Sequence, residues 1–235
     1  MSAKFNSLIG RLTGKVKMSA NPVKGLIVGL SGTDSIATFI LLNEVAKTEG
    51  FAVHGVHYVD RVPAPQTLFM REAYPWLKEK FPEAFIFISG TSCENAARAY
   101  NGNLDQTRWA DLHYRAVEQQ LWTVSTVNAT EKALGTFGIM ANSASIAPIV
   151  SLYKSEVLQI CEEYGVPAAV IAASRLPDCI CGREEFAAEN IELIDELLRY
   201  NLTKDYSGEI IRKATDYIRD TKRANDFKTR TPYTV

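Results

Sequence analysis

The feature that most constrains the fold is the passage from an apolar run to a helix between residues 25 and 45. The run Gly25–Leu30 has the length and composition of a buried parallel strand, and Ile36–Val45 returns to helical periodicity. Residues 31–35, which lie between them, are all small. A strand, a tight turn and a crossover helix in this order predict an open α/β sheet, whose ligands bind at the carboxyl edge where the turn lies.

The rest of the chain alternates short apolar runs with longer segments of helical period, which predicts a doubly wound parallel sheet with helices on both faces. The expected strands are Gly25–Leu30, Ala52–Val59, Phe85–Ser89, Leu121–Thr126 and Ala168–Ala172. The expected helices are Ser35–Glu49, Pro65–Lys80, Asp105–Gln120, Thr130–Gly135, Ser151–Tyr164, Glu184–Tyr200 and Ser207–Asn225. No repeat or Gly/Ser-rich linker interrupts this order, so we expect residues 1–235 to form a single α/β domain.

The predicted turn combines groups suited to a metal-chelated polyphosphate. Its small residues leave backbone N–H groups available to an anion, and the following helix adds the positive end of its dipole. Ser31, Thr33 and Ser35 add hydroxyl donors, whereas Asp34 would repel phosphate unless a divalent cation lay between them. The same residue types also cap helices well, so spacing alone leaves a capped helix without a ligand as an equal alternative.

At this point the residues resemble a known family. The segment VGLSGTDS resembles the S-G-G-x-D-S pyrophosphate loop of the N-type ATP pyrophosphatases, although it is one residue shorter and lacks the second glycine. Four later segments are similar to motifs of one branch, the ammonia-dependent NAD synthetases: TVNATEKALGTF (126–137), PIVSLYKSEVLQICEEYGVP (148–167), ELIDELL (192–198) and DTKR (220–223). Their order and approximate spacing agree from about residue 24 to residue 223.

This resemblance implies an adenine nucleotide alpha-hydrolase-like fold that binds ATP and Mg²⁺. The positions that match its ATP contacts are Gly29, Leu30, Ser31, Gly32, Thr33, Asp34, Ser35, Thr126 and Lys154. Asp34 and Glu131 match the magnesium-binding carboxylates, and Asp34 and Lys154 match residues that act in catalysis. From the residues alone, Glu131 is equally a first-turn glutamate favoured by a helix dipole, and Lys154 is a surface lysine.

The resemblance also implies the reaction. A substrate carboxylate attacks the α-phosphate of ATP, pyrophosphate leaves, and ammonia opens the acyl adenylate; deamido-NAD is the leading carboxylate and NAD the product. Because the chain has no spare length for a glutaminase, we expect free ammonia as the nitrogen donor, or ammonia delivered by a partner. Members of the family form homodimers, so we expect a homodimer here.

Departures from the family pattern concentrate in the substrate-binding segments. NLDQTRWA (103–110) has Thr107 and Trp109 where the family has arginines, and Arg108 between them is the candidate substitute. The family's K-Y-G-D-G-G-A-D loop is replaced by the uncharged GIMANSASIA (138–147), and Leu176 replaces an ATP-contacting Thr/Ser, with Ser174 close by. Lys222 is retained as a substrate-binding candidate. Either another carboxylate is amidated, or other residues hold the dinucleotide, or the activity has decayed.

Composition excludes some classes of function. The net charge of −1 gives no basic field for nucleic acid, and no apolar stretch approaches the ~20 residues of a membrane span. We therefore expect a cytoplasmic protein with no nucleic-acid or membrane partner and with reduced cysteines, including the C-x-C pair Cys179 and Cys181. His54 and His57, three apart on a strand, point to opposite faces and form no joint metal site, whereas Tyr58 is a candidate neighbour of adenine.

Three rival functions remain at this level. A sister ligase would adenylate a different carboxylate. A tRNA-modifying pyrophosphatase that transfers sulfur would ordinarily need paired catalytic cysteines and a basic RNA-binding face. A non-catalytic nucleotide-binding module is the third, and the shortened loop favours it.

Overall fold

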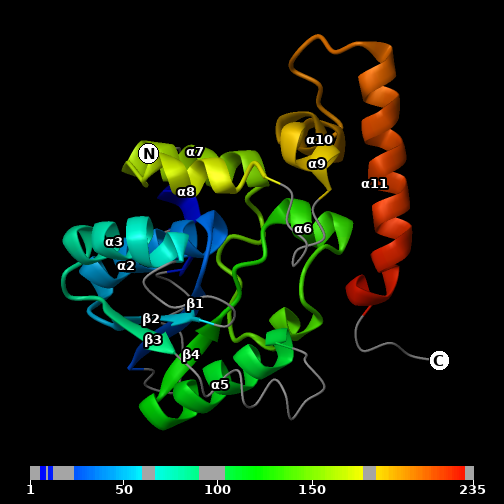
Figure 1. Ribbon diagram of the computed structural model, residues 1–235. Helices are drawn as coiled ribbons and strands as arrows, with labels where there is room; N and C mark the ends of the chain where they lie inside the picture. The colour runs from blue at the N-terminus through cyan, green and yellow to red at the C-terminus, as the bar shows by residue number, and fades with distance from the viewer. Residues whose placement is uncertain are drawn as a thin grey trace.

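The computed structural model describes residues 6–8, 10–12, 24–59, 67–89, 104–176 and 184–230. Within them, four parallel strands form one sheet in the order β3-β2-β1-β4 (Figure 1). The strands are β1 (Gly25–Leu30), β2 (Ala52–Tyr58), β3 (Phe85–Ser89) and β4 (Leu121–Val124). The sheet and its flanking helices confirm the predicted α/β fold class.

Strand β1 lies in the interior of the sheet, paired with β2 on one side and β4 on the other. Its side chains alternate between two cores, because Leu26 and Val28 pack on one face and Ile27 on the other. This burial on both faces explains why the strand is uniformly apolar. The carboxyl ends of β1, β2 and β4 consequently share one edge.

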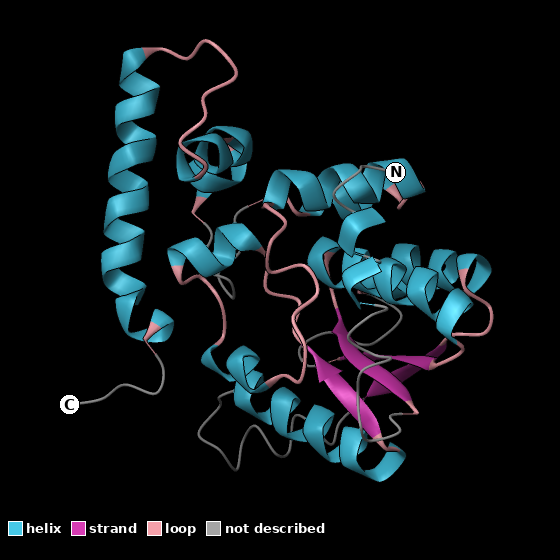
Figure 2. Ribbon diagram, turned by 180° about the vertical axis from the view of Figure 1, so that it is seen from behind, coloured by secondary structure: helices cyan, strands magenta, loops and turns pink. Residues whose placement is uncertain are grey.

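Helices cover both faces of this sheet, as Figures 1 and 2 show. On the face of Leu26 lie α2 (Thr33–Glu49), α3 (Tyr74–Lys80) with the preceding π-helical turn Phe69–Ala73, α7 (Lys154–Tyr164) and α8 (Ala168–Ala173). On the face of Ile27 lies α5 (Leu104–Gln119).

A further group of helices stands beyond the sheet. It consists of α6 (Ala129–Leu134), α9 (Glu185–Glu189), α10 (Ile191–Leu198) and α11 (Gly208–Thr229). Leu134, Ala187 and Ile194 form a separate small core there, with Tyr217 and Ile218 of α11 packed against it. Helix α10 also contacts α7, so this group is attached to the main body at the start of α7 (Figure 1).

The expected strand Ala168–Ala172 is wrong, because these residues form helix α8. The run is short and apolar, and such runs do not distinguish a strand from a buried helix. Four alanines favour the helix, and Pro167 at its N-cap suits a helix start. Beside β4 lies instead the segment around Ile146, which makes an isolated parallel bridge to Val124.

Other predicted boundaries shift by a few residues. Asn190 divides the expected helix Glu184–Tyr200 into α9 and α10, and β4 ends two residues before Thr126. Pro65, Cys179 and Cys181 lie outside the described residues. Among the residues that the structure describes, no helix combines the length and apolarity needed to cross a membrane.

Candidate active site

The turn between β1 and α2 is stabilised by the side chain of Ser35, and there is free space beside Gly32. Ser35 Oγ accepts a hydrogen bond from the Ser31 N–H at 2.8 Å and donates one to the Gly32 carbonyl at 2.8 Å. Gly32, the N-cap of α2, provides no side-chain cap, and a Cβ added there would meet nothing within 4 Å. The first N–H groups of α2 therefore receive no cap from the side chain of residue 32, and the positive end of the helix dipole lies at this turn.

Thr33 points into the protein and away from this space. Its side chain is buried, and its hydroxyl lies 2.6 Å from Ser174 Oγ and accepts from Lys154 Nζ at 2.9 Å. The hydroxyls of Thr33 and Ser35 thus hold the turn together, whereas Ser31 and Gly32 are exposed. Ser174, near the position where the family has an ATP-contacting hydroxyl, contacts the turn through its hydrogen bond with Thr33.

Lys154 is buried, which corrects the expectation of a surface lysine. It begins α7, is only 7% exposed, and forms an ion pair with Asp34 Oδ2. The cause is tertiary, since the first turn of α7 packs between α2 and α10. The second oxygen of Asp34 accepts from Asn128 Nδ2 at 2.8 Å. Residues 34 and 154, which match the family's catalytic residues, are therefore in direct contact.

Asn128 connects Asp34 to Glu131. It caps α6, where its Oδ1 accepts from the Glu131 N–H at 2.9 Å and its own N–H donates to Glu131 Oε2 at 3.2 Å. The two carboxylates expected to bind magnesium therefore contact the same buried asparagine. Sequence reasoning passed over Asn128, although an asparagine followed three residues later by glutamate is the pattern of a capping box.

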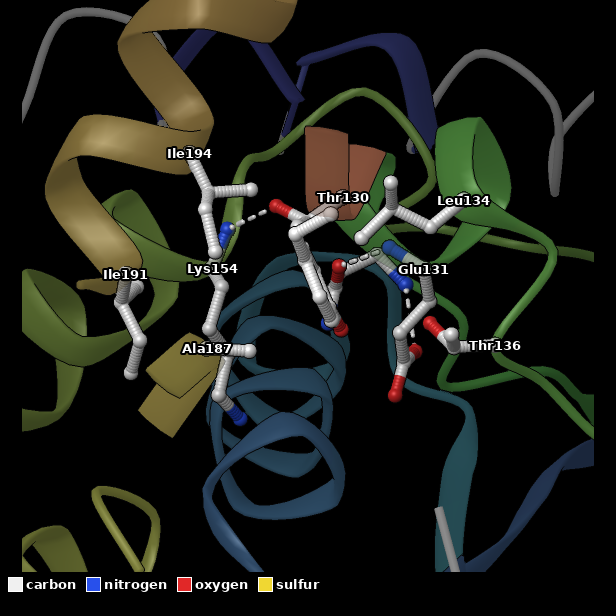
Figure 3. A pocket seen from close by; sticks show the side chains of 10 residues that line it. Thr130, Glu131, Leu134, Thr136, Lys154, Ala187, Ile191 and Ile194 are labelled. Atoms are coloured by element: carbon white, nitrogen blue, oxygen red, sulfur yellow. Dashed lines mark hydrogen bonds between the residues drawn. The ribbon is translucent and has the colours of Figure 1, made fainter. Parts of the chain in front are cut away.

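A cavity of about 60 Å³ opens beside this cluster. Figure 3 shows Thr130, Glu131 and Lys154 on its polar side, and Leu134, Ile191 and Ile194 among its apolar lining. The remaining lining residues are Asn128, Thr136, Ala187 and Tyr217. The apolar part comes from α6, α9, α10 and α11, so the outer helices close one side of the site.

A second cavity, of about 190 Å³, lies at the carboxyl end of β1. It is lined by residues from the ends of β1, β2 and β4 and from α5: Gly29, Leu30, Ser31, Tyr58, Asp105, Arg108, Trp109, Leu112, Val124 and Thr126. Five of the site residues predicted from the sequence therefore line one cavity: Gly29, Leu30, Ser31, Arg108 and Thr126. Burial raises the pKa of Asp105 in its wall, and the charge of Lys228 partly opposes this.

Of the other predicted residues, Tyr58 lines the second cavity and Lys222 lines neither. Lys222 is exposed on α11 and lines neither cavity, so its role in binding substrate stays a prediction. Tyr58 donates to Asp111 Oδ2 at 3.0 Å, as does Arg115 Nε at 2.6 Å. The opposed histidines are confirmed: His57 stacks on Phe69, and His54 lies against Phe85 and Phe87 on the other face. Among described residues, no group of three or more His, Cys, Asp or Glu side chains could hold a metal ion.

Comparison with known proteins gives consistent matches. The family model described as NAD synthase matches residues 5–232. An NH(3)-dependent NAD(+) synthetase from Methanosarcina mazei is 28% identical over 193 residues, which cover 75% of this chain and 74% of the relative.

Solved structures share the fold over the whole chain. An NMN synthetase from Francisella tularensis has a TM-score of 0.73 at 19% identity and covers 98% of both chains. An NH3-dependent NAD synthetase from Campylobacter jejuni, in complex with nitrate, has a TM-score of 0.68 at 18% identity and covers 100% of this chain and 99% of its own.

Proposed function

The chain belongs to the NAD synthase family, and from this premise we propose that it is an ATP-dependent amide ligase which converts deamido-NAD to NAD. The observation that carries the proposal is the contact between Lys154 and Asp34 at the open N-terminus of α2. Those two residues stand 120 positions apart in the sequence, and the family's motifs place the phosphate-binding lysine and the metal-binding carboxylate there.

In this proposal the turn and Lys154 act on the triphosphate. The free N–H groups at the start of α2 bind phosphate oxygens, and the ammonium of Lys154 moves from Asp34 to the leaving pyrophosphate. The substrate carboxylate attacks the α-phosphorus, so that a carboxyl-oxygen–phosphorus bond forms and the bond between the α-phosphorus and the β-bridging oxygen breaks. Ammonia then attacks the acyl carbon, AMP departs, and the nitrogen loses its extra proton to give the amide.

The carboxylates fit the magnesium that the family implies. Asp34 and Glu131 offer oxygen ligands on either side of Asn128, and magnesium in proteins commonly uses one or two carboxylates together with substrate phosphates. When bound, the ion would neutralise charge on the polyphosphate. We also propose that the protein is a cytoplasmic homodimer, since the family's substrate sites lie at a dimer interface.

A second candidate for the carboxylate substrate is nicotinate mononucleotide, which is also called deamido-NMN. Neutral residues stand at three positions where the family has charged groups that clamp a dinucleotide: Thr107, which is buried, Trp109, which packs against the core under α5, and Ile139 in place of a lysine. Each lost charge-assisted contact to phosphate weakens binding by roughly 1.5–3 kcal/mol. A protein described as an NMN synthetase shares this fold over 98% of both chains, which agrees with this alternative.

The test is pyrophosphate release with ATP, magnesium and ammonia against deamido-NAD, deamido-NMN and a panel of other carboxylates. We expect release with deamido-NAD, accompanied by AMP and the amide in equal amounts. Lys154→Met should lower kcat by about 100-fold or more, as for other groups that stabilise transition-state charge. The control is Lys213→Met, which removes an exposed lysine of α11 and should leave kcat unchanged. No turnover with any acceptor, together with intact ATP binding, would instead support a binding module.

A further inference from the structure

Asp195, on α10, is a buried carboxylate that none of the reaction steps uses. It is 0% exposed. Its Oδ1 accepts from Thr130 Oγ1 at 2.5 Å, and its Oδ2 accepts from the Ser155 N–H at 2.7 Å. Burying a carboxylate is costly unless its oxygens are satisfied, so both oxygens being bonded across elements indicates a specific positional role.

The contacts of Asp195 converge on the first turn of α7. Part of this helix start is bonded within α7 itself, since the Tyr153 N–H donates to Glu156 Oε2 at 2.7 Å. The N–H groups of residues 154 and 155 are satisfied from other helices: Thr130 Oγ1 accepts from the Lys154 N–H at 2.9 Å, and Asp195 Oδ2 accepts from the Ser155 N–H. Because the same Thr130 hydroxyl donates to Asp195, the carboxylate fixes the backbone of residues 154 and 155 both directly and through Thr130.

A second contact from the same helix end strengthens this attachment. The guanidinium of Arg199, the C-cap of α10, lies 4.2 Å from the centroid of the Tyr153 ring, and Arg199 Nη2 is 3.2 Å from Glu156 Oε2. The start of α7 is thus held by α10 and its C-cap at residues 153, 155 and 156.

From these contacts we propose that Asp195 is the positioning residue of Lys154: it sets the backbone from which the ammonium reaches the triphosphate. The inference rests on the proposed ligase function for its consequence and on geometry for its premise. Lys154 is the first residue of α7, and its side chain must span to Asp34 and Thr33 of α2. A misplacement of about 1 Å at such a group can lower a rate by about 100-fold.

The experiment compares Asp195→Asn with Glu196→Gln. Glu196 is a matched control because it follows Asp195 on α10, is also buried, and bonds the Thr203 N–H and hydroxyl, away from α7. Asp195→Asn should lower kcat by about 10- to 100-fold with the KM for ATP changed less than about 3-fold, because Lys154 acts mainly on the leaving group. Glu196→Gln should keep kcat within about 2-fold, even if both variants lose the same amount in Tm.

Combination with Lys154→Met separates positioning from general loss of stability. If Asp195 acts through Lys154, adding Asp195→Asn to Lys154→Met should lower kcat by less than about 2-fold more, since residues that act as a unit are not additive. A full multiplication of the two losses would overturn the proposal, as would equal losses in kcat for Asp195→Asn and Glu196→Gln.

A readout without turnover keeps the inference distinct from the proposed function. The rate at which acetic anhydride acylates Lys154, followed by mass spectrometry of its peptide, should rise at least about 5-fold in Asp195→Asn over wild type and stay near wild type in Glu196→Gln, because loosening the helix start exposes a buried amine. If the wild-type chain forms no amide but this rise appears, the ligase proposal fails and the positioning role stands. Unchanged acylation of Lys154 would refute the positioning role itself.

Discussion

Thr33 shows how the orientation of one hydroxyl decides its role. The sequence presents Ser31, Thr33 and Ser35 as equivalent donors in the turn, but in the structure Thr33 is fully buried at the first position of α2. There it accepts from Lys154 and bonds Ser174. We therefore expect Thr33 to act on ATP chiefly by holding Lys154, and only its backbone N–H to face the phosphates.

Replacing Thr33 by valine tests this orientation. The variant keeps the shape but leaves the buried Ser174 hydroxyl and the Lys154 ammonium each short of one partner, which should cost about 1–3 kcal/mol in the free energy of unfolding. Thr33→Ser retains the hydroxyl and should recover most of this loss. Urea denaturation of both variants measures the effect, and equal stability of Thr33→Val and wild type would show that the inward hydrogen bonds contribute nothing.

His57 gives a pH dependence of stability whose sign follows from its burial. Burial lowers the pKa of His57, and the charge of Arg108 acts in the same direction, whereas the hydrogen bond to the Leu30 carbonyl opposes it. The unfolded chain, with a histidine pKa near 6.5, therefore binds the proton more readily than the folded protein. His57 should stabilise the fold fully above about pH 6.5, and this contribution should be lost as pH falls through the lower folded pKa.

The measurement is the free energy of unfolding of wild type and His57→Asn between pH 8 and pH 5. Asparagine can replace the ring Nδ1 donor to the Leu30 carbonyl, which lies at 2.9 Å, but does not titrate. The wild-type curve should fall more steeply than the variant curve below about pH 6.5. Parallel curves would mean that His57 keeps an ordinary pKa in the fold.

At the scale of elements, the sequence predicts those segments whose pattern is local. Gly25–Leu30 and Phe85–Ser89 are strands with the predicted bounds, and the apolar stripe of α7 with Gly165 after it locates that helix within three residues. The predicted strand Ala168–Ala172 is wrong because its apolar run has no period that separates a strand from a buried helix. Other contacts join residues that are far apart in the chain, and the spacing of residues in the sequence does not predict them. They are the bonds of Lys154 to Thr33 and Asp34 and the bond of Asp195 to Ser155.

The junction between α6 and α11 depends on a glycine. Gly135 ends α6 at φ 74°, and a Cβ added there would lie 2.5 Å from Asn225 Cβ and 3.0 Å from the Asn225 carbonyl oxygen on α11. Gly165 ends α7 at φ 73° with nothing within 4 Å of an added Cβ. The two positions share a left-handed backbone but differ in packing, so they form a matched pair.

Gly135→Ala should therefore destabilise the protein more than Gly165→Ala. The left-handed backbone costs alanine about 1 kcal/mol at both sites, and the collision with α11 should add about 1–3 kcal/mol at Gly135 alone. Urea unfolding of the two variants gives the difference directly. If the two alanine variants lose equal stability, α11 can move aside freely and is not fixed against α6.

Across the whole molecule, the site is assembled from two packing units. The sheet with α2 and α7 supplies Asp34 and Lys154, while α6 with α9, α10 and α11 supplies Glu131 and the apolar wall of the smaller cavity (Figures 1 and 3). Asn128 and Asp195 join the units through single hydrogen bonds to Asp34 and Ser155. A ligand that binds between the two packing units should therefore stabilise the molecule as a whole.

This arrangement also predicts how magnesium and nucleotide depend on each other. Both oxygens of Asp34 are engaged, by Lys154 and by Asn128, so a cation alone competes with the buried ammonium for this carboxylate. Magnesium at millimolar concentration should then leave Tm of the wild type nearly unchanged. With a non-hydrolysable ATP analogue at about 100 times its Kd, phosphate oxygens offer Lys154 a new partner, and Tm should rise by roughly 5–10 °C.

In Lys154→Met the competing ammonium is gone, so magnesium alone should raise Tm measurably while the analogue adds less than in wild type. A wild-type protein that magnesium alone stabilises as strongly as it does Lys154→Met would show that the ammonium does not guard Asp34.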